Sequence, residues 1–190
     1  MSRWEPGARE RLVVAAVELF SEKGYDDTTV AEIAERAGLT KSTFFRYFPD
    51  KRELLVAGQE TLGTLFAEGI AGAPPGATPL EAVGAGLEAV AGAMGPINRE
   101  LWPRMKAAIA ASAELQERDA LKSVGLAASM TSALVARGVP EPTAHLAAEL
   151  GLLAFKRGYA EWTEGDSDNG LAHYMSVALN ELRAATATLG

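Results

Sequence analysis

The chain has 190 residues, of which 48% are apolar and 23% charged, a composition typical of one or two folded domains and not of a disordered segment. It contains no cysteine, which excludes disulfide bonds, thiolate metal sites and thiol catalysis. The net charge is −7, but residues 1–52 hold nine basic and nine acidic side chains, so the whole excess of negative charge lies after residue 52. A polyanion is therefore expected to bind only the first part of the chain.

The first forty residues predict two helices. Apolar residues recur at helical spacing over 13–20, and Gly24 supplies a stop. Thr29 and Glu32 have the spacing of a capping box, which predicts the start of a second, short helix. Gly38 is expected to end it.

A third short helix is expected between Thr40, a plausible N-cap, and Pro49, whose predecessor is pushed out of helical geometry. Asp50 and Glu53 offer a further capping arrangement. They predict a longer helix that begins there and extends to Ile70, with Leu55 among its apolar residues.

Residues 71–79, AGAPPGATP, form the clearest break in the chain and predict a loop. Thr78, Pro79 and Glu81 then combine an N-cap, a first-turn proline and a capping-box glutamate. Later helices are expected over 79–94, over 113–137, from Pro142 to beyond Trp162, and over 171–182. A further helix either begins near Pro103 or kinks there. No β-alternation appears, so the sequence predicts an all-α fold with about nine helices.

Residues 29–48 combine a short helix, a glycine-containing turn and a second short helix, which is the layout of a helix-turn-helix. The second helix of that motif enters the major groove of DNA. There Lys41 is suited to guanine or phosphate and the Thr43 methyl to a thymine methyl. The side chains that this layout predicts to contact DNA are Thr29, Thr40, Lys41, Ser42, Thr43 and Lys51.

The aromatic cluster at 44–48 is expected to divide between two faces of this helix. Phe44 and Phe48 are four residues apart, so they point to one side and are predicted to join Phe20, Ile33 and Leu54 in a small core. The polar residues around them then face outward.

The stretch GYDDTTVAEIAERAGLTKSTFFRYFPDKRELL resembles the N-terminal signature of the TetR family of transcriptional regulators, over roughly residues 10–55. The resemblance implies a helix-turn-helix DNA-binding domain over 1–52 and a helical effector-binding and dimerisation domain over 53–190. It puts Lys41, Ser42 and Thr43 at the base-reading turn, and Thr29, Tyr47 and Lys51 on phosphates.

One position departs from that signature. The family usually has a tyrosine where this chain has Phe45, and the hydroxyl of that tyrosine contacts a phosphate. Phe45 has no hydroxyl, so we expect it to play a supporting apolar role. Arg46 or Tyr47 would then replace the lost contact.

The resemblance also implies a cavity for a small-molecule effector in the second domain, expected to be mainly apolar. The alternative for each candidate is an ordinary core position. The candidate ligand-binding residues are Leu62, Phe66, Met94, Trp102, Met105, Met130, Phe155, Tyr159 and Trp162.

The last two helices are expected to form a homodimer, because both carry long apolar stripes and the family dimerises through a four-helix bundle. The alternative is that both stripes bury only into their own subunit. The predicted interface residues are Leu146, Leu150, Leu153, Leu171, Tyr174, Met175, Ala178, Leu179 and Leu182.

Together these features predict a regulator, in the usual case a repressor, that leaves a near-palindromic double-stranded operator when the effector binds. A helical interaction module without DNA binding is the alternative. An enzyme is not expected, because His145 and His173 are the only histidines and lie in no catalytic motif. No cofactor, metal site, secretion signal or membrane segment is expected, so a cytoplasmic location follows.

Overall fold

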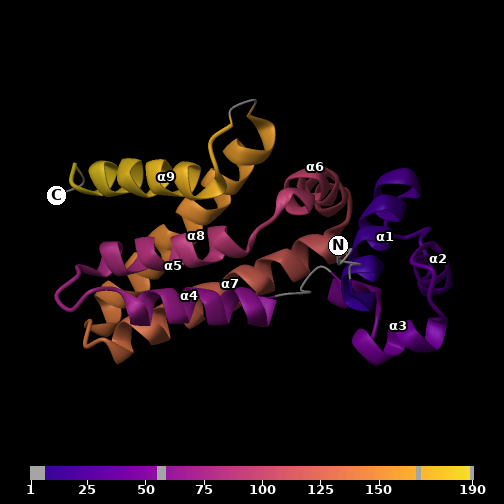
Figure 1. Cartoon of the computed structure of the whole chain (residues 1–190), viewed down its shortest axis with the longest axis horizontal. Helices are drawn as coiled ribbons and strands as arrows, with labels where there is room; N and C mark the ends of the chain where they lie inside the picture. Colours follow the sequence, from indigo (N-terminus) through magenta and orange to yellow (C-terminus); the bar gives the residue numbers. More distant parts are fainter. Residues whose placement is uncertain (1–6, 55–58, 166–167, 189–190) are drawn as a thin grey trace, which may run out of the picture. The chain divides into compact units, whose positions relative to one another are not determined.

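The computed structural model of the chain describes residues 7–54, 59–165 and 168–188. Within these ranges it contains nine α-helices, one 3-10 helix and no strand, so the all-α prediction is confirmed. The helices, shown in Figure 1, are α1 (Ala8–Lys23), α2 (Val30–Arg36), α3 (Lys41–Tyr47), η1 (Lys51–Leu54), α4 (Gln59–Gly72), α5 (Pro79–Ala93), α6 (Pro96–Ala111), α7 (Ala113–Ala136), α8 (Glu141–Glu164) and α9 (Leu171–Thr186).

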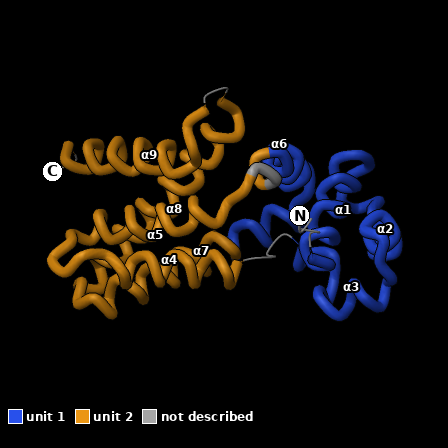
Figure 2. Tube along the Cα trace, in the orientation of Figure 1, with its two compact units in different colours: residues 1–57, 100–121 blue, residues 58–99, 122–190 orange. Residues whose placement is uncertain are grey.

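The chain divides into two compact units, coloured separately in Figure 2. Unit 1 comprises residues 1–57 and 100–121, and unit 2 comprises residues 58–99 and 122–190. Unit 1 therefore takes in most of α6 and the first part of α7, in addition to the N-terminal helices. As functional domains, 1–52 and 53–190 remain a prediction.

Two of the predicted helix starts, those of α2 and α5, are confirmed by their side-chain caps. The Thr29 hydroxyl accepts from the Glu32 amide at 3.3 Å, and the Glu32 carboxylate accepts from the Thr29 amide at 2.9 Å. Thr78 and Glu81 repeat this reciprocal pair at the start of α5. Because a cap satisfies amides that have no partner within the helix, it fixes where each helix begins.

The turn between α2 and α3 depends on Gly38, whose φ of +66° lies in the left-handed region that favours glycine. Gly38 donates its amide to the Glu35 carbonyl, and Leu39 donates to the Ala34 carbonyl, which closes the end of α2. The tight turn places α3 directly after α2, as the helix-turn-helix layout predicted.

The core of unit 1 confirms the predicted inward side of α3. Phe44 and Phe48 are buried, with ring centroids 5.7 Å apart, and belong to one cluster with Phe20, Ile33 and Leu54. Burying an aromatic side chain of this kind contributes about 1.5–3 kcal/mol. The two phenylalanines therefore fix the rotation of α3, and with it the side chains that α3 exposes.

Residues from α6 and α7 complete this core. Ala108 and Leu115 are buried in the same cluster, and Met105 packs against it. Two ion pairs add to the contact: Arg52 Nε lies 3.3 Å from Glu114 Oε1, and an Arg118 guanidinium nitrogen lies 3.2 Å from Glu53 Oε1.

The expected continuous helix from Asp50 to Ile70 is wrong in its first part. Residues Lys51–Leu54 form the 3-10 helix η1, and α4 is described from Gln59. The Asp50 carboxylate accepts from the amides of Arg52 at 2.8 Å and Glu53 at 3.3 Å, so the predicted cap serves this short turn. Leu55 lies outside the described residues.

In unit 2, α4 packs along α5, α8 packs along α9, and α5 also contacts α8 and α9 (Figure 1). Gly158 on α8 lies against the backbone of α9. A β-carbon placed there would lie 2.7 Å from the backbone of Met175. The pairing of these two helices therefore depends on the absence of a side chain at this position.

None of the described helices combines the length and the apolar character that crossing a membrane requires.

Candidate nucleic-acid interface and effector site

The outward side of α3 carries Lys41, Ser42, Phe45, Arg46 and Tyr47, all exposed, while Thr43 is half-buried. The six side chains predicted for DNA contact on and before α3 lie together on this one element, because Phe44 and Phe48 hold its other side in the core.

The first turn of α3 is fixed by two threonines. The Thr40 hydroxyl oxygen accepts from the Thr43 amide at 3.1 Å and lies 2.9 Å from the Thr43 hydroxyl oxygen. The Thr43 hydroxyl is therefore engaged within the turn, which leaves its methyl as the group suited to an apolar contact.

Two cations lie on the exposed side of α3. The Lys41 ammonium is 5.8 Å from the centre of the Phe45 ring, and the Arg46 guanidinium is 5.1 Å from the centre of the Tyr47 ring. Within the described ranges, neither cation is paired with a carboxylate. Both positive charges are thus available to a polyanion.

Thr29 caps α2 at the end of the loop that follows α1. Its hydroxyl donates to Glu32 Oε2 at 2.7 Å, and Lys23 Nζ lies 2.6 Å from Glu32 Oε1. The hydrogen bonds from Lys23 and Thr29 lower the pKa of Glu32 from its usual 4.5 to about 2. The carboxylate therefore stays charged and the cap stays formed at neutral pH.

Lys51 is tied to the loop before α2 and does not project freely into solvent. Its ammonium donates to the carbonyl oxygens of Tyr25 at 2.7 Å, Thr28 at 3.1 Å and Asp26 at 3.4 Å. It also lies 4.0 Å from the centre of the Tyr25 ring. The phosphate contact expected for Lys51 remains a prediction, while its contacts within the protein assign it a role in holding this loop.

Tyr25 packs the same loop into the core of unit 1. Its ring packs edge-on against Phe20, with centroids 5.2 Å apart, and its hydroxyl is buried. Burial, followed by the negative charge of Glu114, raises the pKa of Tyr25, so the hydroxyl stays protonated.

The helix-turn-helix region resembles that of known proteins. The family described as "Bacterial regulatory proteins, tetR family" matches residues 12–57, which include α2, the Gly38 turn, α3 and η1. Residues 12–57 thus belong to the TetR family of regulatory proteins. The chain is 36% identical over 84 residues to the HTH-type transcriptional regulator TcmR of Streptomyces glaucescens, a match that covers 44% of this chain and 37% of TcmR.

A second relative matches further along the chain. The HTH-type transcriptional repressor KstR of Rhodococcus jostii (strain RHA1) is 33% identical over 128 residues, which cover 65% of this chain and 59% of KstR. The chain thus spans less than two thirds of the length of each of these curated relatives.

Solved structures resemble the fold over nearly its full length. FadR of Thermus thermophilus, a TetR-family repressor in complex with lauroyl-CoA, has a TM-score of 0.55 and 24% identity, and covers 92% of this chain and 93% of its own. A TetR-family regulator from Syntrophomonas wolfei has a TM-score of 0.66 at 17% identity, with 96% of each chain covered. At these identities the likeness concerns the fold.

The predicted effector residues fall into both units. Trp102 and Met105 belong to unit 1, where Met105 packs against the core of that unit. The other seven belong to unit 2, and four of them form part of its buried interior. These four are Phe66, Met130, Tyr159 and Trp162.

A row of aromatic rings connects most of the unit 2 candidates. Phe66, Phe155, Tyr159 and Trp162 follow one another with successive ring centroids 5.7 Å apart. The row ends in polar contacts at Tyr159 and Trp162. The Tyr159 hydroxyl donates to the Asn98 carbonyl at 3.2 Å. The Arg99 guanidinium lies 5.7 Å from the centre of the Trp162 ring. Burial raises the pKa of Tyr159, so this hydroxyl remains a donor.

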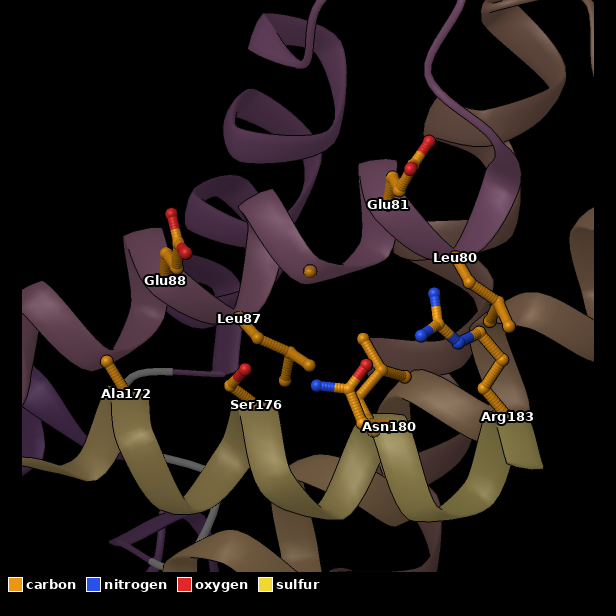
Figure 3. Close-up of a pocket in the computed structure, with 10 residues that line it drawn as sticks. Leu80, Glu81, Leu87, Glu88, Ala172, Ser176, Asn180 and Arg183 are labelled. Atoms are coloured by element: carbon orange, nitrogen blue, oxygen red, sulfur yellow. The ribbon is translucent and has the colours of Figure 1, made fainter. Parts of the chain in front are cut away.

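Two hollows lie elsewhere in unit 2. An open groove of about 730 Å³ runs between α4 and α7, lined by small and polar residues that include Gln59, Thr64, Ser129 and Ser132. A cavity of about 160 Å³ lies between α5 and α9, and Figure 3 shows Asn180 and Arg183 on α9 facing the α5 side. None of the nine predicted effector residues lines either hollow.

The predicted dimer residues divide by exposure. As dimer residues all nine remain a prediction, but Leu171, Met175 and Ala178 are buried within unit 2 itself. The reason is that α9 packs along α8 and α5, which use this side of the helix. Leu146 and Leu153 on α8 are 59% and 44% exposed, and the remaining four are half-buried: Leu150, Tyr174, Leu179 and Leu182.

Some residues that matter at these sites were not predicted. Val177 is an exposed apolar residue beside the buried side of α9, and a helical-wheel count from Met175 and Ala178 could have indicated it. Glu114 and Arg118 contact η1 from more than fifty residues away in the sequence, so no local pattern could have indicated them.

Proposed function

We propose that this TetR-family chain is a ligand-responsive, DNA-binding regulator of transcription. In the proposed mechanism a homodimer represses by binding a near-palindromic operator in the cytoplasm, and a small effector releases it. The observation that carries the proposal is α3 itself. Its exposed side holds Lys41 and Arg46, which have no carboxylate partner among the described residues, and its other side is fixed by two buried phenylalanines.

Repression is favoured as the direction of regulation. KstR, which matches 65% of this chain at 33% identity, is named as a transcriptional repressor. Repression requires only that the bound protein block the promoter, so it needs no contact with RNA polymerase.

The proposed dimer uses the exposed leucines of α8. Leu146 and Leu153 are seven residues apart, on one side of the helix, and Leu150 lies between them half-buried. Large exposed apolar side chains that gather on one side of a helix favour a protein partner. A two-fold dimer would place two α3 helices about one DNA turn, or ~34 Å, apart and would require a palindromic operator.

The proposed effector is small and mainly apolar, and it would bind against the aromatic row of unit 2. Aromatic side chains that end in a few polar groups are typical of ligand sites. The row from Phe66 to Trp162, with Tyr159, Asn98 and Arg99 at its polar end, has this character. The lauroyl-CoA complex of the Thermus thermophilus repressor makes acyl-CoA a reasonable first probe. By linkage, effector and operator must weaken each other by the same factor.

Selection from a pool of random DNA duplexes tests the DNA-binding part. We expect the protein to enrich a palindromic sequence, and Lys41→Ala to bind it about 10- to 100-fold more weakly. Arg104→Ala is the control, because it removes an equal charge from an exposed position of unit 1 on α6. Failure to enrich any sequence, or equal weakening by both changes, would contradict the proposal and favour a helical interaction module.

Titration with lauroyl-CoA tests the effector part. Binding beside Trp162 should change the tryptophan emission of the protein and release the selected duplex in a gel-shift series. In Trp162→Phe the emission change should shrink while release persists. A duplex bound more tightly in the presence of acyl-CoA would show that the direction of regulation is wrong.

A further inference from the structure

Large exposed apolar side chains in the described residues 7–54 occur at two positions, Phe45 and Tyr47, and both lie on α3. Phe45 is 49% exposed and Tyr47 is 39% exposed. Tyr47 has a hydroxyl that hydrogen-bonds well to phosphate or base edges, whereas Phe45 has no polar atom in its side chain. An apolar ring kept in solvent on a DNA-facing helix therefore calls for an apolar partner.

The Phe45 ring is held in place by its neighbours. It meets the buried Phe44 ring edge-on, with centroids 5.5 Å apart and planes inclined by 83°. The Lys41 ammonium lies 5.8 Å from its centre, one helical turn away on the same flank of α3. The flank therefore presents a fixed apolar surface with a positive charge beside it.

The major groove offers one apolar group to such a surface. Each base pair displays hydrogen-bond donors and acceptors there, and the C5 methyl of thymine is the only hydrocarbon group among them in unmodified DNA. A ring without donors or acceptors cannot distinguish the other base edges. The neighbouring ammonium, by contrast, is suited to the O6 and N7 acceptors of guanine.

We propose that Phe45 is a specificity-determining residue that contacts a thymine methyl, and that Lys41 contacts a guanine next to that thymine. Each operator half-site would then contain adjacent thymine and guanine positions, on the same or on opposite strands. This rests on the proposed function, because it requires α3 to lie in the major groove. It replaces the supporting apolar role expected for Phe45 with direct reading of a base.

The competing arrangement is a ring that lies against the sugar–phosphate backbone. In that case Phe45 would contribute to affinity for any duplex and would be insensitive to the thymine methyl. A tyrosine at this position would then strengthen binding, because its hydroxyl would gain a phosphate contact.

The experiment uses the full-length protein and the duplex enriched by selection. Each thymine of that duplex is replaced in turn by deoxyuridine, which removes the methyl and changes no hydrogen-bonding group. We expect one thymine in each half-site at which the replacement weakens wild-type binding about fourfold, the effect of losing one buried methyl-sized group. Replacement in both half-sites should weaken binding about 15-fold.

The variants assign this sensitivity to a residue. Phe45→Ala should bind the thymine and deoxyuridine duplexes equally, while Tyr47→Ala, the matched control on the other flank of α3, should still distinguish them. Phe45→Tyr should bind the selected duplex more weakly, because its hydroxyl would be pressed against a methyl. Since both side chains are exposed, circular dichroism should show unchanged folding in all three variants.

The outcomes separate this inference from the proposed function. If selection enriches no sequence, the regulator proposal itself fails. If a sequence is enriched but no thymine shows methyl sensitivity, or if Phe45→Tyr binds more tightly, Phe45 faces the backbone and this inference is overturned. Loss of the sensitivity in Tyr47→Ala, with Phe45→Ala unchanged, would assign the thymine contact to Tyr47 and also overturn it.

Discussion

The Lys51 ammonium lies 2.7 Å from the carbonyl oxygen of Tyr25 and 4.0 Å from the centre of the Tyr25 ring. One side chain at the start of η1 therefore secures the loop that leads into α2. With two further carbonyl oxygens, those of Asp26 and Thr28, within reach, the three N–H donors of the lysine are used inside the protein. A lysine that sequence reasoning assigns to DNA thus supports the helices that carry the DNA-facing side chains.

Replacing this lysine should destabilise unit 1. We expect Lys51→Met to lower the free energy of unfolding by about 1.5–3 kcal/mol, because charge-assisted hydrogen bonds to backbone carbonyls are lost. Urea unfolding measures the change. Lys41→Met is the control, and it should alter stability by less than about 0.5 kcal/mol because Lys41 is exposed.

The salt dependence of duplex binding separates this role from a phosphate contact. If Lys51 acts through the loop, Lys51→Met weakens binding while the slope of log K against log salt stays the same. A slope reduced by about 0.9 per protomer would instead show that Lys51 neutralises a phosphate.

The capping box of α2 should give unit 1 a specific dependence on acid. The pKa of Glu32 is lowered from 4.5 to about 2, mainly by Lys23, so its contribution to stability is present above pH 4.5 and is lost as the pH falls towards 2. Glu32→Gln removes this contribution. We expect the melting temperatures of wild type and Glu32→Gln to differ at pH 6 and to converge between pH 4.5 and 2.

Thermal melting followed by circular dichroism at a series of pH values makes the comparison. A difference between the two proteins that stays constant from pH 6 to pH 2 would show that the Lys23–Glu32 pair contributes nothing that depends on the charge of Glu32.

The contact of α8 with α9 should not tolerate a side chain at Gly158. Gly158→Ala would place a methyl 2.7 Å from the backbone of Met175, so the helices must move apart, at a cost of about 1–3 kcal/mol or more. Gly92→Ala is the matched control in α5, where no atom beyond the neighbouring residues and the backbone of its own helix lies within 4 Å of the added carbon. It should be neutral or stabilising by up to about 1 kcal/mol. Urea unfolding distinguishes the two, and equal stabilities would show that the helices accommodate the methyl freely.

The proposed dimer should depend on α8. We expect Leu146→Lys combined with Leu153→Lys to convert the protein to monomers, because like charges would meet across a two-fold axis in place of apolar side chains. Val124→Lys is the control on α7, where Val124 is 67% exposed and so is at least as accessible as either leucine. Analytical ultracentrifugation measures the mass. A double variant that remains dimeric would place the interface elsewhere.

The sequence predicted the local features of the chain well because their causes are local. A threonine followed three residues later by a glutamate satisfies the amides that begin a helix, and this reasoning located the starts of α2 and α5. The four-residue spacing of Phe44 and Phe48 was sufficient to divide α3 into a buried and an exposed side. The same pattern, together with the signature around it, identified the TetR family.

Tertiary structure alone decided which apolar and charged residues meet. The apolar residues along α9 predict that one side of this helix is buried, but they do not show which helix covers it. In the structure, α8 and α5 cover it and bury Leu171 and Met175 within their own unit. Lys51 has the sequence context of a phosphate ligand, yet three carbonyl oxygens lie within its reach because the loop after α1 folds beside η1. Spacing along the chain determines the side of a helix on which a residue lies. Its contacts depend on how distant segments pack, and that packing gave Lys51 and Met175 their partners within the chain.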